Sequence, residues 1–440
     1  MHPIVQKIKD AGVVGAGGAG FPSHIKYNTQ AEILIANGAE CEPLLYKDKE
    51  LMRVYPEEVK KGMQLVAEAI GASRLIMGIK AKNTEAIGQF RRVFGGTNIE
   101  IFEMGDYYPA GDEYVLVYEA TGRLIPYGGY PFNIGCVVSN VETLLNVALA
   151  DSGVPVTESF VTITGAIKNP MTLKVPIGTP INDLLDYAGG PSTNKQIIAL
   201  AGGAMMGQLE TDFNKPVTKL SAGYIFLPID HILIRRRNQT IPEIKKIGQS
   251  ACDQCTYCTE FCPRYLLGYE IEPHKVMRSL GFAGEKDDFW GKYAVNCCEC
   301  NLCSLFACPE DLDPKQACVR SKTNITLKKI KYNPPERELN AHPMQAHRKV
   351  SIKKLTRKLG LTPYDHRAEF IDIDFKPPKV IIPLSQHIGQ PAEALVRAGD
   401  KVSVGQKIGS VAENATGADI HASINGIVTQ VDKNIIIEAE

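Results

Sequence analysis

The sequence has no excess of charge of either sign and no long apolar run. It contains 49 Lys and Arg against 49 Asp and Glu, so its formal net charge is zero. A neutral chain has no overall field that attracts nucleic acid or an anionic membrane. Its least polar stretches, 13–21 and 197–207, are Gly-rich and about ten residues long, whereas a spanning helix needs about 20 apolar residues. We expect neither a nucleic-acid binder nor an integral membrane segment.

The N-terminus lacks a basic segment followed by an apolar one and a small-residue cleavage site, so we expect a cytoplasmic protein. Cysteine is also scarce over most of the chain, because only Cys41 and Cys136 of the twelve cysteines lie outside 252–318. In a large chain without an export signal, such a dense block indicates metal or redox chemistry rather than a disulfide scaffold.

The pattern of apolar residues divides the chain into segments with different predicted secondary structure. β-rich runs at 31–36 and 74–79 alternate with helical spacing at 56–70, and a helix that Ser139 or Asn140 can cap follows, which indicates an α/β domain. Short strands and a glycine-stopped helix at 181–190 indicate a compact α+β module, and the last segment reads as a small β-barrel or sandwich. We predict a multidomain α/β and α+β protein with segments 1–157, 158–240, 241–324, 325–376 and 377–440.

A basic stretch separates the cysteine block from the C-terminal segment. Residues 320–358 hold twelve Lys and Arg against only Glu336 and Glu338. We predict an exposed linker with an amphipathic helix at 349–359 that docks through Val350, Leu355 and Leu359. A solvated basic face is the simpler interpretation, and a docking surface for a partner is the alternative.

The cysteine block contains the same motif twice. Cys252, Cys255, Cys258 and Cys262-Pro263 have the spacing that wraps three thiolates around one iron–sulfur cube and sends the fourth to another. A second run repeats it with one extra residue, at Cys297, Cys300, Cys303 and Cys308-Pro309. We predict two 4Fe-4S clusters with exchanged fourth ligands: Cys252, Cys255, Cys258 and Cys308 for the first, and Cys297, Cys300, Cys303 and Cys262 for the second.

The roles of two further cysteines and the identity of the metal are not fixed by this assignment. Cys298 is either a buried apolar cysteine or an alternate ligand to Cys297, and Cys318 is expected to serve in packing. A pair of four-cysteine zinc sites is the alternative to iron–sulfur, but zinc sites use two Cys-x2-Cys pairs per ion rather than three cysteines at successive three-residue steps.

A glycine-rich loop near the N-terminus offers its backbone to a ligand. From Gly15 to Gly20 no side chain is larger than a methyl group, so the N–H groups are accessible to a phosphate. Gly15, Gly17 and Gly20 match the Gly-x-Gly-x-x-Gly pattern of dinucleotide-binding loops, but the sequence before them does not predict the strand that such a loop follows. With the polar segments 37–43 and 139–143, the loop has the groups to contact the phosphate, ribityl chain and ring edge of a flavin.

These motifs resemble a known family. Segments 15–22, 37–43, 111–113 and 140–143 resemble the flavin loops of the NADH-oxidising subunit of respiratory complex I, and 165–190 resembles the ubiquitin-like SLBB module. The double cysteine motif resembles the RnfC and PduS branch, and 396–409 with 421–428 resembles its barrel-sandwich hybrid domain. That domain comes last here, which resembles the PduS arrangement. Ala39 and Ser139 depart from the complex I loops, and the hairpin at 423–426 has no lysine for lipoylation.

The resemblance implies FMN, two 4Fe-4S clusters, NADH as donor, and a soluble reductase of cobalamin in a bacterial microcompartment. No residue is expected to be a general acid or base, because the cofactors carry the chemistry. The residues expected to contact FMN or NADH are Gly15, Gly17, Gly18, Gly20, Phe21, Lys26, Asn37, Glu40, Gly111, Asp112, Glu113, Asn140 and Thr143.

The partner and the direction of electron flow have several candidates. Cobalamin, a corrinoid enzyme system or an iron–sulfur shell protein is the expected acceptor, and residues 1–10 form either an encapsulation helix or a helix packed on its own domain. The alternatives are a non-enzymatic relay subunit fed by a partner and an RnfC-type member of an electron transport complex docked at a membrane.

Overall fold

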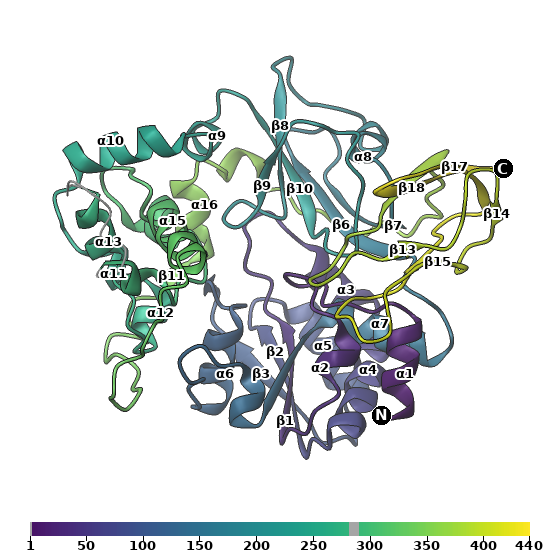
Figure 1. Ribbon diagram of the computed structural model, residues 1–440, viewed down its shortest axis with the longest axis horizontal. Helices are drawn as coiled ribbons and strands as arrows, with labels where there is room; N and C mark the ends of the chain where they lie inside the picture. The colour runs from purple at the N-terminus through teal and green to yellow at the C-terminus, as the bar shows by residue number, and fades with distance from the viewer. Residues whose placement is uncertain (1, 281–289) are drawn as a thin grey trace.

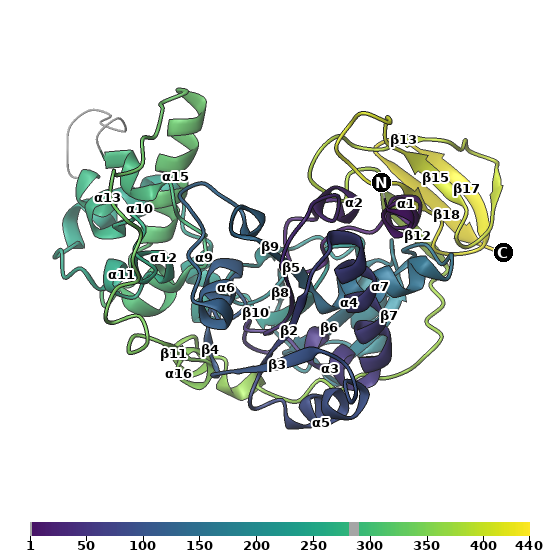
Figure 2. The ribbon, with the colours of Figure 1, turned by 90° about the horizontal axis from the view of Figure 1, so that it is seen from below.

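The computed structural model describes residues 2–280 and 290–440. Figure 1 shows four regions: an α/β domain at the bottom, a mixed β-sheet above it, the cysteine-rich helices at one end and a small β structure at the other. In the perpendicular view of Figure 2 the cysteine-rich helices and the C-terminal β structure again lie at opposite ends. Over the described ranges, no helix combines the length and the apolar character needed to cross a membrane.

The N-terminal domain is built on a parallel sheet in the order β3-β2-β1-β5. The strands are β1 (Ile33–Gly38), β2 (Arg74–Lys80), β3 (Ile99–Met104) and β5 (Cys136–Asn140). Around them lie α1 (Pro3–Asp10), α2 (Ser23–Lys26), α3 (Lys47–Val54), α4 (Pro56–Ile70), α5 (Thr84–Val93), α6 (Glu113–Thr121), η1 (Pro131–Ile134) and α7 (Val141–Asp151). The predicted helix at 56–70 is confirmed, and Asn140 caps α7 by accepting from the backbone N–H of Glu142 at 2.8 Å.

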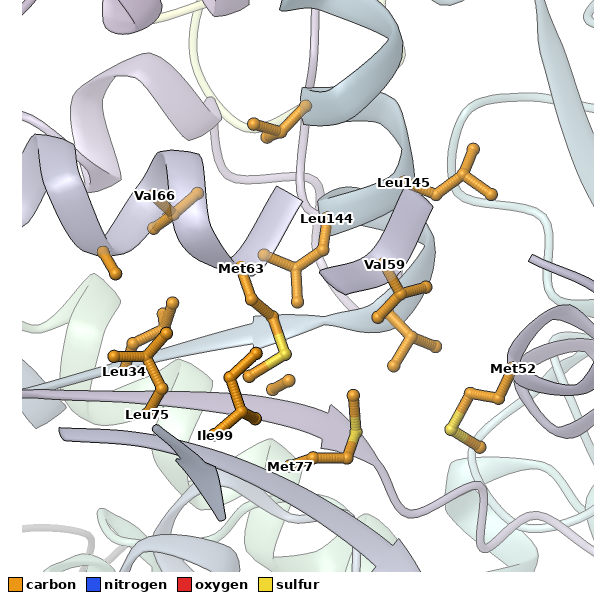
Figure 3. Close-up of a cluster of buried hydrophobic side chains, with 14 of the residues drawn as sticks. Leu34, Met52, Val59, Met63, Val66, Leu75, Met77, Ile99, Leu144 and Leu145 are labelled. Atoms are coloured by element: carbon orange, nitrogen blue, oxygen red, sulfur yellow. The ribbon is translucent and has the colours of Figure 1, made fainter. Parts of the chain in front are cut away.

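The core of this domain lies between the sheet and the α4–α7 pair. Figure 3 shows Met63 of α4 and Leu144 of α7 directed at Leu34, Leu75 and Met77 on the strands. Helix α1 buries Ile4, Val5 and Ile8 in the same core. The N-terminal helix is therefore packed on its own domain.

The second region is a five-stranded sheet in the order β7-β6-β10-β8-β9. Its elements are β6 (Glu158–Gly165), β7 (Met171–Pro176), α8 (Ile181–Tyr187), β8 (Ile197–Ala201), β9 (Gln208–Glu210) and β10 (Gly223–Pro228). Strand β6 runs parallel to β10 and antiparallel to β7, and α8 packs Leu184 and Leu185 into the core beneath the sheet. This mixed sheet with one packed helix is the α+β module that the sequence predicts.

The cysteine-rich region is helical. It contains α9 (Ile232–Arg237), α10 (Ile241–Ala251), α11 (Tyr257–Glu260), α12 (Pro263–Leu266), α13 (Pro273–Ser279), η2 (Gly291–Ala294), the π-helical turn η3 (Cys303–Ala307) and α15 (Pro314–Leu327). Each cysteine run is followed by a proline-initiated turn or by α15, and the short helices are held apart by loops in which Gln254, Thr256, Glu299 and Asn301 take positive φ. Non-glycine residues rarely adopt this conformation, so the loops are tightly constrained by their surroundings.

The basic stretch after α15 folds back onto the rest of the chain instead of remaining a linker throughout. Strand β11 (Val350–Ser351) pairs with β4 (Tyr107–Tyr108), and α16 (Ile352–Lys358) follows, then η4 (Thr362–Tyr364). The predicted docking residues Val350, Leu355 and Leu359 are all buried in one cluster. The helix begins three residues later than predicted, because Ser351 caps it and Val350 belongs to the strand.

The C-terminal region consists of two small sheets, β12-β18-β17-β14 and β13-β15-β16. The strands are β12 (Lys379–Pro383), β13 (Glu393–Ala394), β14 (Lys401–Val402), β15 (Lys407–Ser410), β16 (Ile420–His421), β17 (Gly426–Val431) and β18 (Asn434–Ala439). The buried Lys219 joins this region to the N-terminal domain, since its Nζ donates to the carbonyls of Gly12 at 2.7 Å and Asp419 at 2.8 Å.

Candidate functional site

The carboxyl ends of β1 and β5 form the centre of the first site. The chain runs outward from β1 to β2 and β3 and then returns to the other side of β1 as β5, so the strand order reverses between β1 and β5. In open parallel sheets, ligands bind at the carboxyl ends of the strands at such a reversal. Asn37 and Asn140 are register partners at this edge, which brings the two predicted polar segments side by side.

The glycine-rich loop lies against the N-terminus of α7 at this edge. The backbone N–H of Ala16 donates to Thr143 Oγ1 at 3.0 Å, and a Cβ on Gly17 would clash with the Asn140 side chain. A Cβ on Gly18 would meet no atom within 4 Å, and Phe21 is 41% exposed. The loop is therefore fixed at Ala16 and Gly17 and open at Gly18.

Buried charges hold the loop from below. Lys47 Nζ forms an ion pair of 2.5 Å with Glu142 Oε2 and donates to the Ala16 carbonyl at 3.3 Å. Burial opposes the charge of Lys47, but Glu142 and then Asp48 raise its pKa above the usual range. Asp48 accepts from Asn140 Nδ2 at 2.7 Å through Oδ2, while its buried Oδ1 has no hydrogen-bond partner among the described residues.

Glu40 completes this polar cluster. Its Oε2 accepts the backbone N–H of Asp48 at 3.1 Å. Burial, and then the nearby Asp48 carboxylate, raises the pKa of Glu40 to about 8. Two buried carboxyl groups this near to each other cannot both ionise cheaply, which favours the protonated form of Glu40 near neutral pH.

The predicted segment 111–113 also lies near the site, but its residues make contacts in different directions. The Gly111 carbonyl accepts from Asn37 Nδ2 at 2.9 Å, and Lys26 Nζ lies 3.4 Å from Glu113 Oε1. Asp112 instead caps α6 and pairs with Arg264 Nη2 of the cysteine-rich region at 3.0 Å.

Sequence reasoning missed Lys47, Asp48 and Glu142. A lone lysine normally indicates a solvated position, and nothing in the pattern around Lys47 predicts its burial. Glu142 lies inside the predicted 140–143 segment, and its buried partner could be found only in three dimensions. Ser139, where the complex I loop has Asn, holds Tyr27 OH at 2.6 Å beneath the site.

The first predicted cysteine set converges on one cavity. Cys252, Cys255, Cys258 and Cys308 all line it, together with His274 and Met277. Burial, and then the nearness of Cys308, Cys252 and Cys255, raises the pKa of Cys258 to about 12. Four thiols around one cavity are a donor set that fits a cluster, because a bound metal replaces their protons.

The second set also converges. Burial, and then Cys298 and Cys297, raises the pKa of Cys262 above its usual range. Burial raises the pKa of Cys303 as well, with Cys297, Cys262 and Cys258 as its next causes. Cys303 is thus near thiols of both sets, and the donors of the second set too fit a cluster.

Cys297 and Cys298 both lie at this second site. Cys298 interacts with Cys300 and Cys262, and Cys297 interacts with Cys318, Cys303 and Cys262. Cys318 is fully buried in an apolar cluster beside α13, as its packing role predicts.

One tyrosine of the N-terminal domain contacts the second cysteine run. The hydroxyl of the buried Tyr108 donates to the carbonyl of Cys300 at 2.7 Å. Cys41, which follows Glu40, packs in the same apolar cluster as Tyr108, Cys298 and Cys300. The second cysteine set is therefore packed against the domain that contains the glycine-loop site.

Four family models match the chain in the order of its regions. The Nuo51 FMN-binding domain matches residues 8–149 and the SLBB domain 160–209. The 4Fe-4S dicluster domain matches 251–313, and the RnfC barrel-sandwich hybrid domain matches 357–440. With the geometry above, these matches define the class: the chain is a multidomain oxidoreductase that uses FMN and iron–sulfur clusters, as its sequence motifs predict.

Comparison with curated proteins identifies the family within this class. Cobalamin reductase PduS of Salmonella typhimurium is 38% identical over 98% of this chain and 95% of the relative, and the Citrobacter freundii protein is 37% identical over the same shares. A component of the proton-translocating ferredoxin:NAD(+) oxidoreductase complex of Clostridium ljungdahlii is 33% identical over 59% of this chain and 55% of the relative. The chain belongs to the PduS family.

A solved structure shares the fold. The crystal structure of an NAD+-reducing NiFe hydrogenase in the H2-reduced state superposes with a TM-score of 0.50 at 20% identity, over 76% of this chain and 63% of that chain.

Proposed function

We propose that the chain takes electrons from NADH on a bound FMN and passes them singly through two 4Fe-4S clusters to a corrinoid. The observation that carries the proposal is the contact between the second cysteine set and the domain of the glycine loop, where Tyr108 OH donates to the Cys300 carbonyl. A flavin, when bound, exchanges two electrons with NADH and single electrons with a cluster.

The residues around the glycine loop would hold FMN at the carboxyl edge of the sheet. The loop backbone, which is open at Gly18, and the start of α7 suit an anionic phosphate, because both present N–H groups. Asp48 Oδ1 lies 4.0 Å from Lys47 Nζ but has no hydrogen-bond partner among the described residues, and it suits a ribityl hydroxyl. Phe21 and the Lys26–Glu113 pair are at the exposed side, where a nicotinamide can approach.

Each cluster would be held by the predicted ligands, the first by Cys252, Cys255, Cys258 and Cys308 and the second by Cys262, Cys297, Cys300 and Cys303. The contact through Tyr108 supports an order in which the second cluster receives electrons first. The electrostatic influence of Cys258 on Cys303 supports transfer between the clusters, because it indicates that the two sets are near each other.

The acceptor and the setting are further proposals. Two relatives that match over 98% of this chain are named cobalamin reductases, which supports cobalamin as the acceptor. We also propose that the protein acts in the cytoplasm within or beside a bacterial microcompartment, with an iron–sulfur shell protein as a second partner. The predicted segments 1–157, 158–240, 241–324 and 377–440 would then be the flavin, SLBB, dicluster and barrel-sandwich domains.

The order of the clusters can be tested by EPR on matched variants. Cys300→Ala should remove the second cluster, and the first cluster should then be reduced by dithionite but not by NADH. Cys255→Ala should remove the first cluster and leave the second reducible by NADH. If the first cluster of Cys300→Ala responds to NADH as fast as in the wild type, the order is wrong.

A relay subunit without NADH oxidation is the second candidate. It is favoured by the relation to one component of a larger oxidoreductase complex. In that case the holoprotein would hold flavin and clusters yet take electrons only from a partner.

A further inference from the structure

A pocket of about 370 Å³ lies where the flavin domain meets the cysteine-rich region. Its walls come from α6, the 127–128 loop, the start of α12, the 295–298 segment and the chain around Tyr332. This volume is in the range of pockets that hold small organic ligands. Unlike the cavity of the first cysteine set, which all four cysteines line, it touches only Cys297 of the second set, together with the neighbouring Cys298. It is therefore a space beside the second cluster site rather than that site itself.

Four tyrosines form the apolar part of the pocket: Tyr114, Tyr127, Tyr269 and Tyr332. Their rings pack on one another, with centroids 5.5 Å apart for Tyr114 and Tyr269 and 5.4 Å apart for Tyr127 and Tyr269.

The hydroxyls of these tyrosines are already engaged by the protein. Tyr114 OH donates to the Gly129 carbonyl at 2.7 Å, and Tyr127 OH accepts the backbone N–H of Glu270 at 3.2 Å. Tyr332 OH lies 3.4 Å from Glu270 Oε2. The rings, and not the hydroxyls, are thus what the pocket offers to a ligand.

Arg264 is the cation of the pocket. The residue is only 9% exposed, and its guanidinium lies 3.5 Å from the centroid of the Tyr114 ring. Nη2 donates to Asp112 Oδ2 at 3.0 Å, but the buried Nη1 has no hydrogen-bond partner among the described residues. A buried guanidinium N–H is strongly disfavoured without an acceptor, so an acceptor oxygen is the missing element of this pocket.

We propose that this pocket binds a small planar ring that carries an anionic oxygen, and that it positions this ring beside Cys297 and Cys298 as a port for electron exchange. The tyrosine rings would stack on or against the ligand ring, and Arg264 Nη1 would donate to the anionic oxygen. The redox part of this inference rests on the proposed second cluster. In each transfer the cluster is oxidised by one electron and the ring-bearing carrier is reduced by one, and no covalent bond forms or breaks.

Anthraquinone-2-sulfonate is the probe, because it is a planar one-electron acceptor with one anionic group. Its binding to the oxidised holoprotein is measured by isothermal titration without NADH, so the result does not depend on the proposed donor. Arg264→Gln should weaken binding at least tenfold and Tyr332→Leu at least threefold. Tyr187→Leu, at an exposed tyrosine on α8, is the matched control and should leave the affinity unchanged. Methyl viologen, a cationic acceptor, should bind no more tightly to the wild type than to Arg264→Gln.

If Arg264→Gln does not fold, Tyr332→Leu tests the proposal alone. This variant is expected to fold because Tyr332 is only half-buried. The proposal is overturned if the wild type does not bind the probe, or if both pocket variants that fold bind it like the wild type. Displacement of the probe by NADH would also overturn it, because the pocket would then be the nicotinamide site. A holoprotein that binds the probe normally but is not reduced by NADH would keep this inference and reject the proposed donor.

Discussion

Removing the Lys47 side-chain amine should destabilise the glycine-loop site more than removing any exposed charge of the same domain. The side chains of Lys47 and Glu142 are each 2% exposed, and no solvent is available to replace the ion pair between them. Lys47→Met leaves the Glu142 carboxylate buried and removes the donor to the Ala16 carbonyl. Breaking a buried pair in this way costs about 3–5 kcal/mol. We expect the lower end, because burial raises the pKa of Glu142 and the carboxyl can take up a proton.

Native-state hydrogen exchange of the amides in α7 measures this cost locally, which suits a multidomain chain that does not unfold in one step. A loss of about 3 kcal/mol should speed exchange roughly a hundredfold, since each 1.4 kcal/mol is a factor of ten. FMN content should fall as well, because the loop loses its anchor at Ala16.

Two controls make the result interpretable. Lys61 of α4 pairs with Asp151, the last residue of α7, at 2.8 Å, but its side chain is 46% exposed. Lys61→Met should therefore change the exchange rate in α7 by less than about fivefold. Adding Glu142→Gln to Lys47→Met should recover part of the loss, because it removes the unpaired charge. The reasoning is refuted if Lys47→Met exchanges within threefold of the wild type, or if the double variant is less stable than the single one.

Three further predictions concern packing, clusters and pH. Gly62→Ala should lower the free energy of unfolding by about 1–3 kcal/mol and so lower the thermal midpoint, because its Cβ would collide with the Leu144 carbonyl where α4 crosses α7. Gly88→Ala, on the open surface of α5, should raise the free energy of unfolding by about 0.5–1 kcal/mol. Equal effects of the two variants in calorimetry would contradict this packing. Cys255→Ala should lower the iron content from about eight to about four per chain with FMN unchanged, and loss of FMN with iron intact would count against separate sites. Burial raises the pKa of Glu40 from 4.5 to about 8, so the folded state holds a proton that the unfolded chain releases, and stability should fall as pH rises through this window. Glu40→Gln should flatten that dependence of the urea midpoint, and an unchanged slope would exclude Glu40 as its source.

Local patterns in the sequence predicted the elements well. The spacing of Val59, Met63 and Val66 is enough to predict α4, and the cysteine spacing groups the four thiols of the first set, which line one cavity. Both signals are periodic and depend on the chain's own geometry. The start of α16 was misjudged because Val350 is held by a strand, β4, that is some 240 residues away in the chain.

The polar part of the site could not be derived in the same way. The burial of Lys47 and the raised pKa of Glu40 depend on partners from other elements, and no local pattern encodes them. The same holds for Arg264, whose place between Tyr114 and Asp112 arises only where two domains meet. The sequence thus predicts which residue types gather at the ligand, but not the buried charges that support them.

Anaerobic titration of the reconstituted holoprotein with NADH, followed by absorbance, tests the central claim most directly. The account predicts that the flavin band bleaches and that the broad cluster absorbance then falls, with about eight irons per chain. A protein that contains flavin and about eight irons but does not respond to NADH would contradict it and would identify a relay whose electrons come from a partner.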